Sequence, residues 1–141
     1  LDNLLENGTI RPMVNQILAH PGNTPTDLIR YSQSQGILVE AYSPVAHGKI
    51  FNRPELKAVA DSYGVTIAQL CIRYCLQLGM LPLPKTVTPK WMRENAAVDF
   101  EITAADIALL ANAEKFSDYG DAAIFPVYGG KLRPDGTCVA R

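Results

Sequence analysis

The chain has 141 residues, of which 48% are hydrophobic and 19% are charged, and its formal net charge is −1. This composition predicts one ordinary globular domain, and the absence of a basic block argues against a surface that binds nucleic acid. No apolar run approaches the roughly 18 residues of a membrane span, and the N-terminus lacks the basic and apolar segments of a signal peptide. The three cysteines have no metal-ligand spacing, so we expect a protein of the reducing cytoplasm.

Hydrophobic periodicity predicts strands that alternate with helices. In chain order we expect a helix over 1–7, a strand over 12–18, a helix over 24–35, a strand over 37–42, helices that open at Pro54 and Thr66, a strand over 80–84, and helices that open at Thr88 and Thr103. Thr24, Thr66 and Thr103 each precede an Asp or Gln by three positions, the pattern of a capping box. From Phe116 onward no periodicity remains, so we divide the chain into 1–115 and a tail, 116–141.

Strands separated by helices form βαβ units and a parallel sheet. Three parallel strands leave two unpaired edges, and parallel sheets need cover on both faces. No glycine-rich turn of the GxGxxG type follows a strand, which disfavours a doubly wound dinucleotide fold. A (β/α)8 barrel takes about 250 residues, and this chain begins with Leu1 inside a helix. We therefore expect an α/β fold, the C-terminal portion of a (β/α)8 barrel, as a fragment or completed by a partner.

Four clusters of residues, three of them at predicted strand ends, follow one another along the chain: Asn15-Gln16 with His20-Pro21, Ala41-Tyr42-Ser43-Pro44, Pro84-Lys85-Thr86 and Glu94-Asn95. In their order and spacing these clusters resemble the aldo-keto reductase family. The match covers residues 1 to about 115 and is similar to bacterial reductases of the diketogluconate-reductase type. The resemblance implies an NADP(H)-dependent oxidoreductase that reduces aldehydes or ketones, small carbonyl substrates, by hydride transfer.

The resemblance also implies a cofactor site at the C-terminal ends of the strands, where (β/α)8 barrels carry their chemistry and bind phosphate. In that site Gln16 would hold the nicotinamide carboxamide and Tyr42 would stack on the nicotinamide. The loop around the pyrophosphate would contain Ser43, Val45, Ala46 and His47. The cluster at the 2′-phosphate would contain Lys85, Thr86 and Val87, and the contacts to the adenine would come from Trp91, Glu94 and Asn95. A lysine and a hydroxyl beside a helix N-terminus form an anion site on physical grounds as well.

Three residues in or near these clusters bear on the choice of cofactor and on catalysis. Trp91 stands where the family commonly has an arginine, and tryptophan cannot bind phosphate in the bidentate manner of arginine. NAD(H) is therefore kept as an alternative cofactor. His20 is interpreted as a structural histidine, and His47 as an exposed loop histidine without a catalytic role.

The catalytic Asp, Tyr, Lys and His of the family come from the first half of its barrel, and no position of this chain matches them. We therefore assign no catalytic residue and no metal ligand, and we predict that the chain is inactive without the missing N-terminal half of the barrel. The tail, with Phe125, Tyr128 and Gly129-Gly130, is a candidate for the loop that closes over substrate. Two alternatives stay open: a non-catalytic nucleotide-binding module or regulatory subunit, and a ligand-free remnant that pairs its open sheet edges in a dimer.

Overall fold

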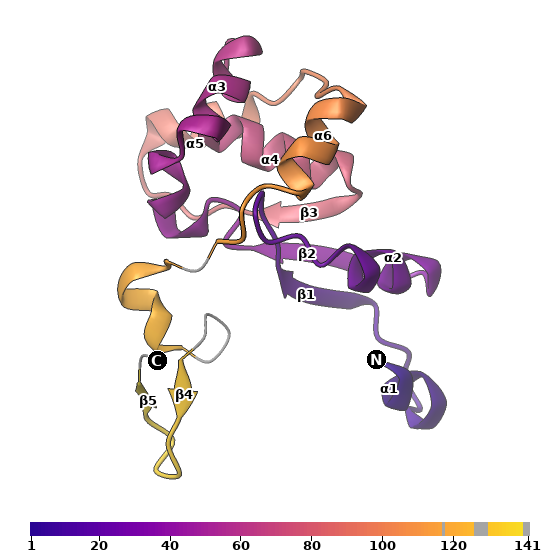
Figure 1. Cartoon of the computed structure of the whole chain (residues 1–141). Helices are drawn as coiled ribbons and strands as arrows, with labels where there is room; N and C mark the ends of the chain where they lie inside the picture. Colours follow the sequence, from indigo (N-terminus) through magenta and orange to yellow (C-terminus); the bar gives the residue numbers. More distant parts are fainter. Residues whose placement is uncertain (117, 126–129, 140–141) are drawn as a thin grey trace.

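The computed structural model of the chain describes residues 1–116, 118–125 and 130–139. Three strands form a parallel sheet in the order β1-β2-β3, as predicted: β1 (Val14–Leu18), β2 (Leu38–Tyr42) and β3 (Met80–Leu83). The helices are α1 (Asp2–Asn7), α2 (Thr26–Ser34), α3 (Pro54–Ser62), α4 (Ile67–Gln77), α5 (Pro89–Ala96) and α6 (Ala104–Ala111), with two 3-10 helices, η1 (Ala46–Asn52) and η2 (Gly120–Ile124) (Figure 1). None of the described helices is long and apolar enough to cross a membrane.

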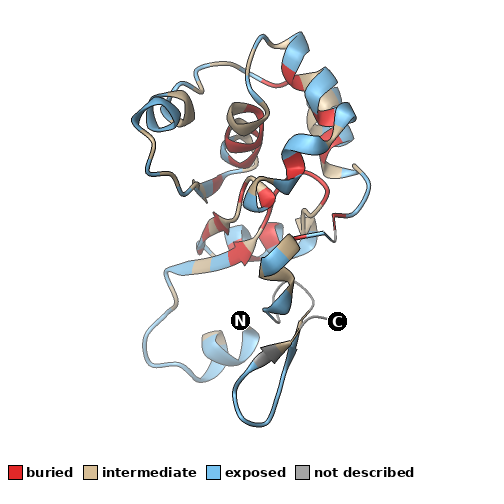
Figure 2. Cartoon of the chain, turned by 90° about the vertical axis from the view of Figure 1, so that its left-hand side faces the viewer, coloured by how far each residue is buried: buried red, intermediate tan, exposed pale blue. Residues whose placement is uncertain are grey.

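Helices cover one face of the sheet and leave the other face exposed. Ile17, Val39, Ala41 and Met80 point to the covered face and are buried. Figure 2 shows the buried residues, in red, gathered where the helices meet the sheet. The opposite face carries the exposed side chains of Val14, Leu38, Leu81 and Leu83. This exposed apolar face and the two edge strands are the features that the strand count predicts.

Helix α4 supplies the centre of the core. Its N-terminus has the predicted capping box, because Thr66 Oγ1 accepts a hydrogen bond from the Gln69 amide at 3.2 Å and Gln69 Oε1 accepts one from the Thr66 amide at 3.0 Å. Behind this cap lies the buried stripe Leu70, Cys71, Tyr74 and Cys75. Both cysteines are free and buried, as the sequence predicts, and burial raises the pKa of the Cys75 thiol to about 12.

The predicted cap at Thr24 is wrong. Helix α2 begins at Thr26, Pro25 occupies the cap position, and no side chain caps the helix. Thr24 Oγ1 instead donates to the His20 carbonyl at 3.1 Å and lies 2.7 Å from the hydroxyl of Tyr74. Because Tyr74 is fully buried, its hydroxyl needs a partner inside the protein. The tertiary structure therefore uses Thr24 to satisfy the core rather than the helix end.

The C-terminal residues contain more regular structure than the sequence predicts. After η2, the strands β4 (Lys131–Leu132) and β5 (Cys138–Val139) pair in an antiparallel hairpin. The turn between them is closed by Arg133 N donating to Thr137 O at 2.8 Å, with Gly136 at a φ of +81°. Strands of two residues are too short for an alternating pattern to appear in the sequence. Tyr128 and Gly129, which we associated with a substrate-covering loop, lie outside the described residues.

Candidate functional site

A cleft of about 1020 Å³ opens at the C-terminal ends of β2 and β3. One wall is the loop that follows β2, and another is formed by the segment that follows β3 together with α5. The two segments are far apart in the sequence, but Tyr42 and Leu83 are partners in the parallel register of β2 and β3. Parallel pairing therefore places both loops at the same edge of the sheet.

Nine of the twelve predicted site residues line this cleft. They are Tyr42, Ser43, Val45, His47, Lys85, Thr86, Trp91, Glu94 and Asn95. The structure thus brings together the predicted nicotinamide-stacking, pyrophosphate, 2′-phosphate and adenine residues, which the sequence places in two separate blocks.

Three predicted site residues do not line the cleft. Gln16 lies within β1, which ends at Leu18 as predicted; its amide donates to Glu40 Oε2 at 3.0 Å on the exposed face of the sheet. Ala46 is fully buried, so its side chain supports the loop from the core side. Val87 is 84% exposed.

The loop that follows β2 has an unusual backbone. Ser43, Ala46 and His47 have φ values of 52°, 46° and 54°, in the left-handed region that residues other than glycine rarely adopt. Short bonds hold this shape, since the Ala46 amide donates to Ser43 O at 2.9 Å and the Gly48 amide to Val45 O at 2.7 Å. His47 is exposed, as interpreted from the sequence, and its Nε2 lies 3.3 Å from Ser43 Oγ. Such conformations concentrate at ligand clamps and switches.

Within the described part of the chain, some charged residues of the cleft form ion pairs and others do not. Lys57 lies 2.7 Å from both carboxylate oxygens of Asp61, and Glu94 pairs with Lys90 at 3.7 Å. Lys85 has no ion-pair partner among the described residues and is exposed ahead of α5. Thr86 Oγ1 accepts from the Thr88 amide at 3.1 Å, which leaves its own proton free to be donated. A cation, a hydroxyl and the positive end of α5 thus form an arrangement suited to an anion.

Tyr42 and Trp91 offer aromatic surfaces in the same cleft. Tyr42 ends β2, and Trp91 on α5 is 56% exposed. A flat, partly exposed aromatic ring can stack on a heterocyclic ring of a ligand. Among the described residues, no group of three or more His, Cys, Asp or Glu side chains could hold a metal ion.

One wall of the cleft is not predicted from the sequence. Lys57, Ala60 and Asp61 of α3 and the segment 65–68 at the start of α4 line it. In the sequence these residues form an ordinary amphipathic helix and a capping box, and no spacing in either marks a ligand site. Only the packing of α3 and α4 beside the strand ends brings them to the cleft.

His20 lies outside the cleft and is a satisfied structural residue, as interpreted from the sequence. It is fully buried, its Nδ1 lies 2.7 Å from the Pro21 carbonyl, and its Nε2 lies 3.1 Å from the hydroxyl of Tyr119. The rings of Phe116 and Tyr119 pack against it edge-on at 5.6 Å and 5.9 Å. Burial lowers the pKa of His20 below its usual 6.5, because desolvation disfavours the imidazolium.

We expect this buried histidine to make stability depend on pH. Since its folded-state pKa is the lower one, the unfolded chain binds the extra proton first as the pH falls through 6.5. The free energy of unfolding is therefore highest above pH 6.5, decreases as the pH falls below 6.5, and becomes constant below the folded-state pKa of His20. Urea unfolding between pH 8 and pH 5 checks this. His20→Gln should flatten the profile, whereas His47→Gln in the exposed loop should not; an equal slope in both variants would contradict the assignment.

Comparison with known proteins adds family information to this geometry. Residues 1–115 match the model of the Aldo/keto reductase family. The chain is 41% identical over 108 residues to the uncharacterized oxidoreductase YtbE and 36% identical over 108 residues to glyoxal reductase, both of Bacillus subtilis. Each alignment covers 76% of this chain and 39% of the relative, so the chain spans about two fifths of the length of these proteins.

The fold agrees with the solved structures of such enzymes. The Bombyx mori aldo-keto reductase AKR2E4 in complex with NADP superposes with a TM-score of 0.75 at 32% identity, covering 86% of this chain and 43% of that one. The prediction of an α/β fold that corresponds to part of a (β/α)8 barrel is therefore confirmed.

Proposed function

The chain belongs to the aldo/keto reductase family, and from that premise we propose that its cleft binds NADP(H) as the cofactor-binding part of a carbonyl reductase. The observation that carries this proposal is the convergence of nine predicted cofactor residues, from two distant segments, on one cleft. A bound cofactor would supply the hydride that reduces an aldehyde or ketone to an alcohol. The residues of this chain would bind and orient it.

The donor set of the cleft fits the separate parts of such a dinucleotide. Tyr42 would stack on the nicotinamide at the end of β2, and the loop from Ser43 to His47 would surround the pyrophosphate. Lys85, with Thr86 and the start of α5, supplies the positive charge that a 2′-phosphate requires. Trp91 would stack on the adenine. Gln16 would contact the carboxamide only after leaving its bond to Glu40.

The reaction as a whole is proposed for the complete protein rather than for this chain. We assign no residue here as the proton donor, and the carbonyl substrate is proposed only as a class. NADPH is favoured over NADH because Lys85 lacks an ion-pair partner among the described residues. The replacement of the usual arginine by Trp91 keeps NADH as the second candidate.

The proposal is tested by titrating the purified chain with NADPH and with NADH while recording the fluorescence of Trp91, the only tryptophan. Saturable quenching that is stronger for NADPH is the expected result. Quenching that is equal for both would keep the cleft as a dinucleotide site and remove the 2′-phosphate preference. Absence of quenching would contradict a cofactor site in this chain.

A stacking role for Tyr42 gives a second prediction for the same titration. Tyr42→Ala should weaken NADPH and NADH alike, by about fivefold, because both share the nicotinamide ring. Tyr31→Ala is the matched control, since Tyr31 is a partly exposed tyrosine on α2 that does not line the cleft. Unchanged affinity in Tyr42→Ala would mean that Tyr42 serves packing alone.

A further inference from the structure

The strained loop after β2 continues directly into a contact with the C-terminal part of the chain. The loop passes through η1 and ends at Arg53, the residue before α3. The Arg53 amide donates to Ile50 O at 3.2 Å, and Ile50 is 1% exposed, so the end of η1 is anchored in the core. The guanidinium of Arg53 does not line the large cleft. It contacts Glu55 on α3, and it also reaches Glu114 and Phe116, more than fifty positions away.

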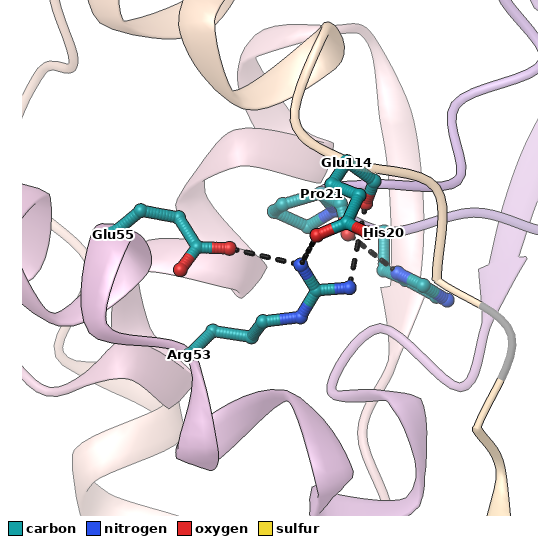
Figure 3. Close-up of polar contacts among 5 residues, drawn as sticks. All are labelled: His20, Pro21, Arg53, Glu55 and Glu114. Atoms are coloured by element: carbon teal, nitrogen blue, oxygen red, sulfur yellow. Dashed lines mark hydrogen bonds and ion pairs between the residues drawn. The ribbon is translucent and has the colours of Figure 1, made fainter.

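Arg53 holds the segment that follows α6. Its Nη1 lies 3.3 Å from Glu114 Oε2, its Nη2 donates to the Glu114 carbonyl at 3.5 Å, and its guanidinium carbon lies 5.4 Å from the ring centre of Phe116. Figure 3 shows the guanidinium between the carboxylates of Glu55 and Glu114. The Arg53 side chain is 21% exposed and that of Glu114 is 86% exposed, so their ion pair lies at the surface and is weak by itself. The firmer contact is the packing of the guanidinium over the ring of Phe116, which is 6% exposed.

The other side of this segment rests on a part of the structure that does not belong to the cleft loop. The Phe116 amide donates to Gly22 O at 2.9 Å, and the Tyr119 hydroxyl contacts His20 and accepts from Asn23 Nδ2 at 3.1 Å. Phe116 and Tyr119 are 6% and 4% exposed. Residues 114–116 are therefore held between a support after β1 and Arg53 at the end of the cleft loop, and Tyr119 rests on the same support.

We propose that Arg53 is a positioning residue that couples occupancy of the cleft to the order of residues 114–116, which follow α6. A ligand that contacts Ser43, Val45 and His47 restricts the strained loop, the restriction passes through η1 to Arg53, and Arg53 then holds Glu114 and Phe116 more firmly. The coupling rests on the proposed function in one respect, since the ligand is taken to be an anionic dinucleotide. Energetic coupling of this kind is reciprocal, so loosening the segment also loosens the loop.

Glu55 provides a matched control within the same cluster. Its Oε1 lies 3.0 Å from the Arg53 Nη1 atom that also faces Glu114. Glu55 belongs to the first turn of α3, directly beyond Arg53, so this ion pair does not connect Arg53 to residues 114–116. Glu55→Gln should therefore preserve the coupling, whereas Arg53→Gln should abolish it. Arg53→Lys keeps the charge without the planar fork and should restore the coupling in part.

Hydrogen exchange followed by mass spectrometry tests the proposal on the purified chain. The reporters are the peptides that contain the Phe116 amide, bonded to Gly22 O, and the Gly48 amide, bonded to Val45 O. Saturation with NADPH, monitored separately through Trp91 fluorescence, should slow exchange at both reporters about fivefold in the wild-type chain and in Glu55→Gln. In Arg53→Gln the cofactor should still slow exchange at Gly48 but no longer at Phe116. Glu114→Gln, at an 86% exposed side chain, should reduce the effect without a risk to folding.

Two outcomes overturn the coupling directly: unchanged exchange at Phe116 in a wild-type chain saturated with NADPH, or equal protection in the wild type and Arg53→Gln. If neither Trp91 fluorescence nor the Gly48 reporter responds to NADPH, the proposed cofactor site is what fails. The coupling is then tested by hydrogen exchange of the ligand-free variants. In that case Arg53→Gln and Glu114→Gln must speed exchange at Gly48 while Glu55→Gln does not, and equal exchange in all three variants overturns it.

Discussion

Replacing Lys85 with alanine is expected to weaken NADPH binding about tenfold while NADH binding changes by less than about twofold. The reason is that the two cofactors differ only in the 2′-phosphate, and Lys85 is the cleft cation without an ion-pair partner among the described residues. Lys57, the other lysine of the cleft, is already paired with Asp61. The loss should appear as a shift in the midpoint of the Trp91 titration, with the NADH curve as an internal reference.

Lys90→Ala is the control for this measurement. Lys90 lies on the first turn of α5, pairs with Glu94 and is not part of the cleft lining. Lys90 carries the same charge as Lys85 and lies close to it in the chain. A general electrostatic attraction of the anionic cofactor would therefore be weakened in both variants. Equal weakening by Lys85→Ala and Lys90→Ala would remove the specific 2′-phosphate role, as would equal weakening of NADPH and NADH by Lys85→Ala.

Replacing Leu70 with alanine should cost about 3 kcal/mol of unfolding free energy. Leu70 is completely buried and is the first residue of the buried stripe of α4, one turn after the cap at Thr66. The substitution removes the apolar contacts of the side chain and leaves a cavity that the surrounding helices can close only in part. Urea unfolding monitored by circular dichroism measures the difference in unfolding free energy. An unchanged denaturant slope would show that the same surface is exposed on unfolding in both proteins.

The same helix supplies the control. Leu76→Ala makes an identical change of residue type in α4, at a side chain that is 37% exposed, so helix propensity contributes equally in both variants. We expect Leu76→Ala to cost about 1 kcal/mol or less. If the two substitutions destabilised the chain equally, α4 would not be the centre of the core, and the buried stripe would have to be assigned to another face.

The candidate site follows from the sequence and the tertiary structure together. Strand-end clusters in the sequence pointed to Tyr42, Ser43, Lys85 and Thr86, and parallel pairing of β2 and β3 then explains why they meet. Gln16 shows the limit of this reasoning, because the sequence does not tell which neighbour a polar side chain will bond; here the Gln16 amide donates to Glu40 on the next strand. The wall formed by α3 and the start of α4 carried no signal, since its residues follow ordinary helical periodicity.

By itself, the sequence determined those features of this protein that depend on neighbouring residues. The capping box at Thr66 formed as predicted, and the stops at Gly36 and Gly79 have the positive φ that glycine adopts without strain. Thr103 caps α6 by accepting from the Asp106 amide, but the reciprocal bond of a capping box is absent because the Thr103 amide donates to the hydroxyl of Tyr63. The tertiary structure decided what depends on residues far apart in the chain. Thr24 contacts the hydroxyl of Tyr74 instead of capping α2. His20 packs on Phe116, and Arg53 contacts Phe116 and Glu114, in each case across more than fifty residues. The physical reason is that a local bond closes within one turn of chain, whereas a buried hydroxyl, imidazole or guanidinium must find its partner wherever the packing of the core places one.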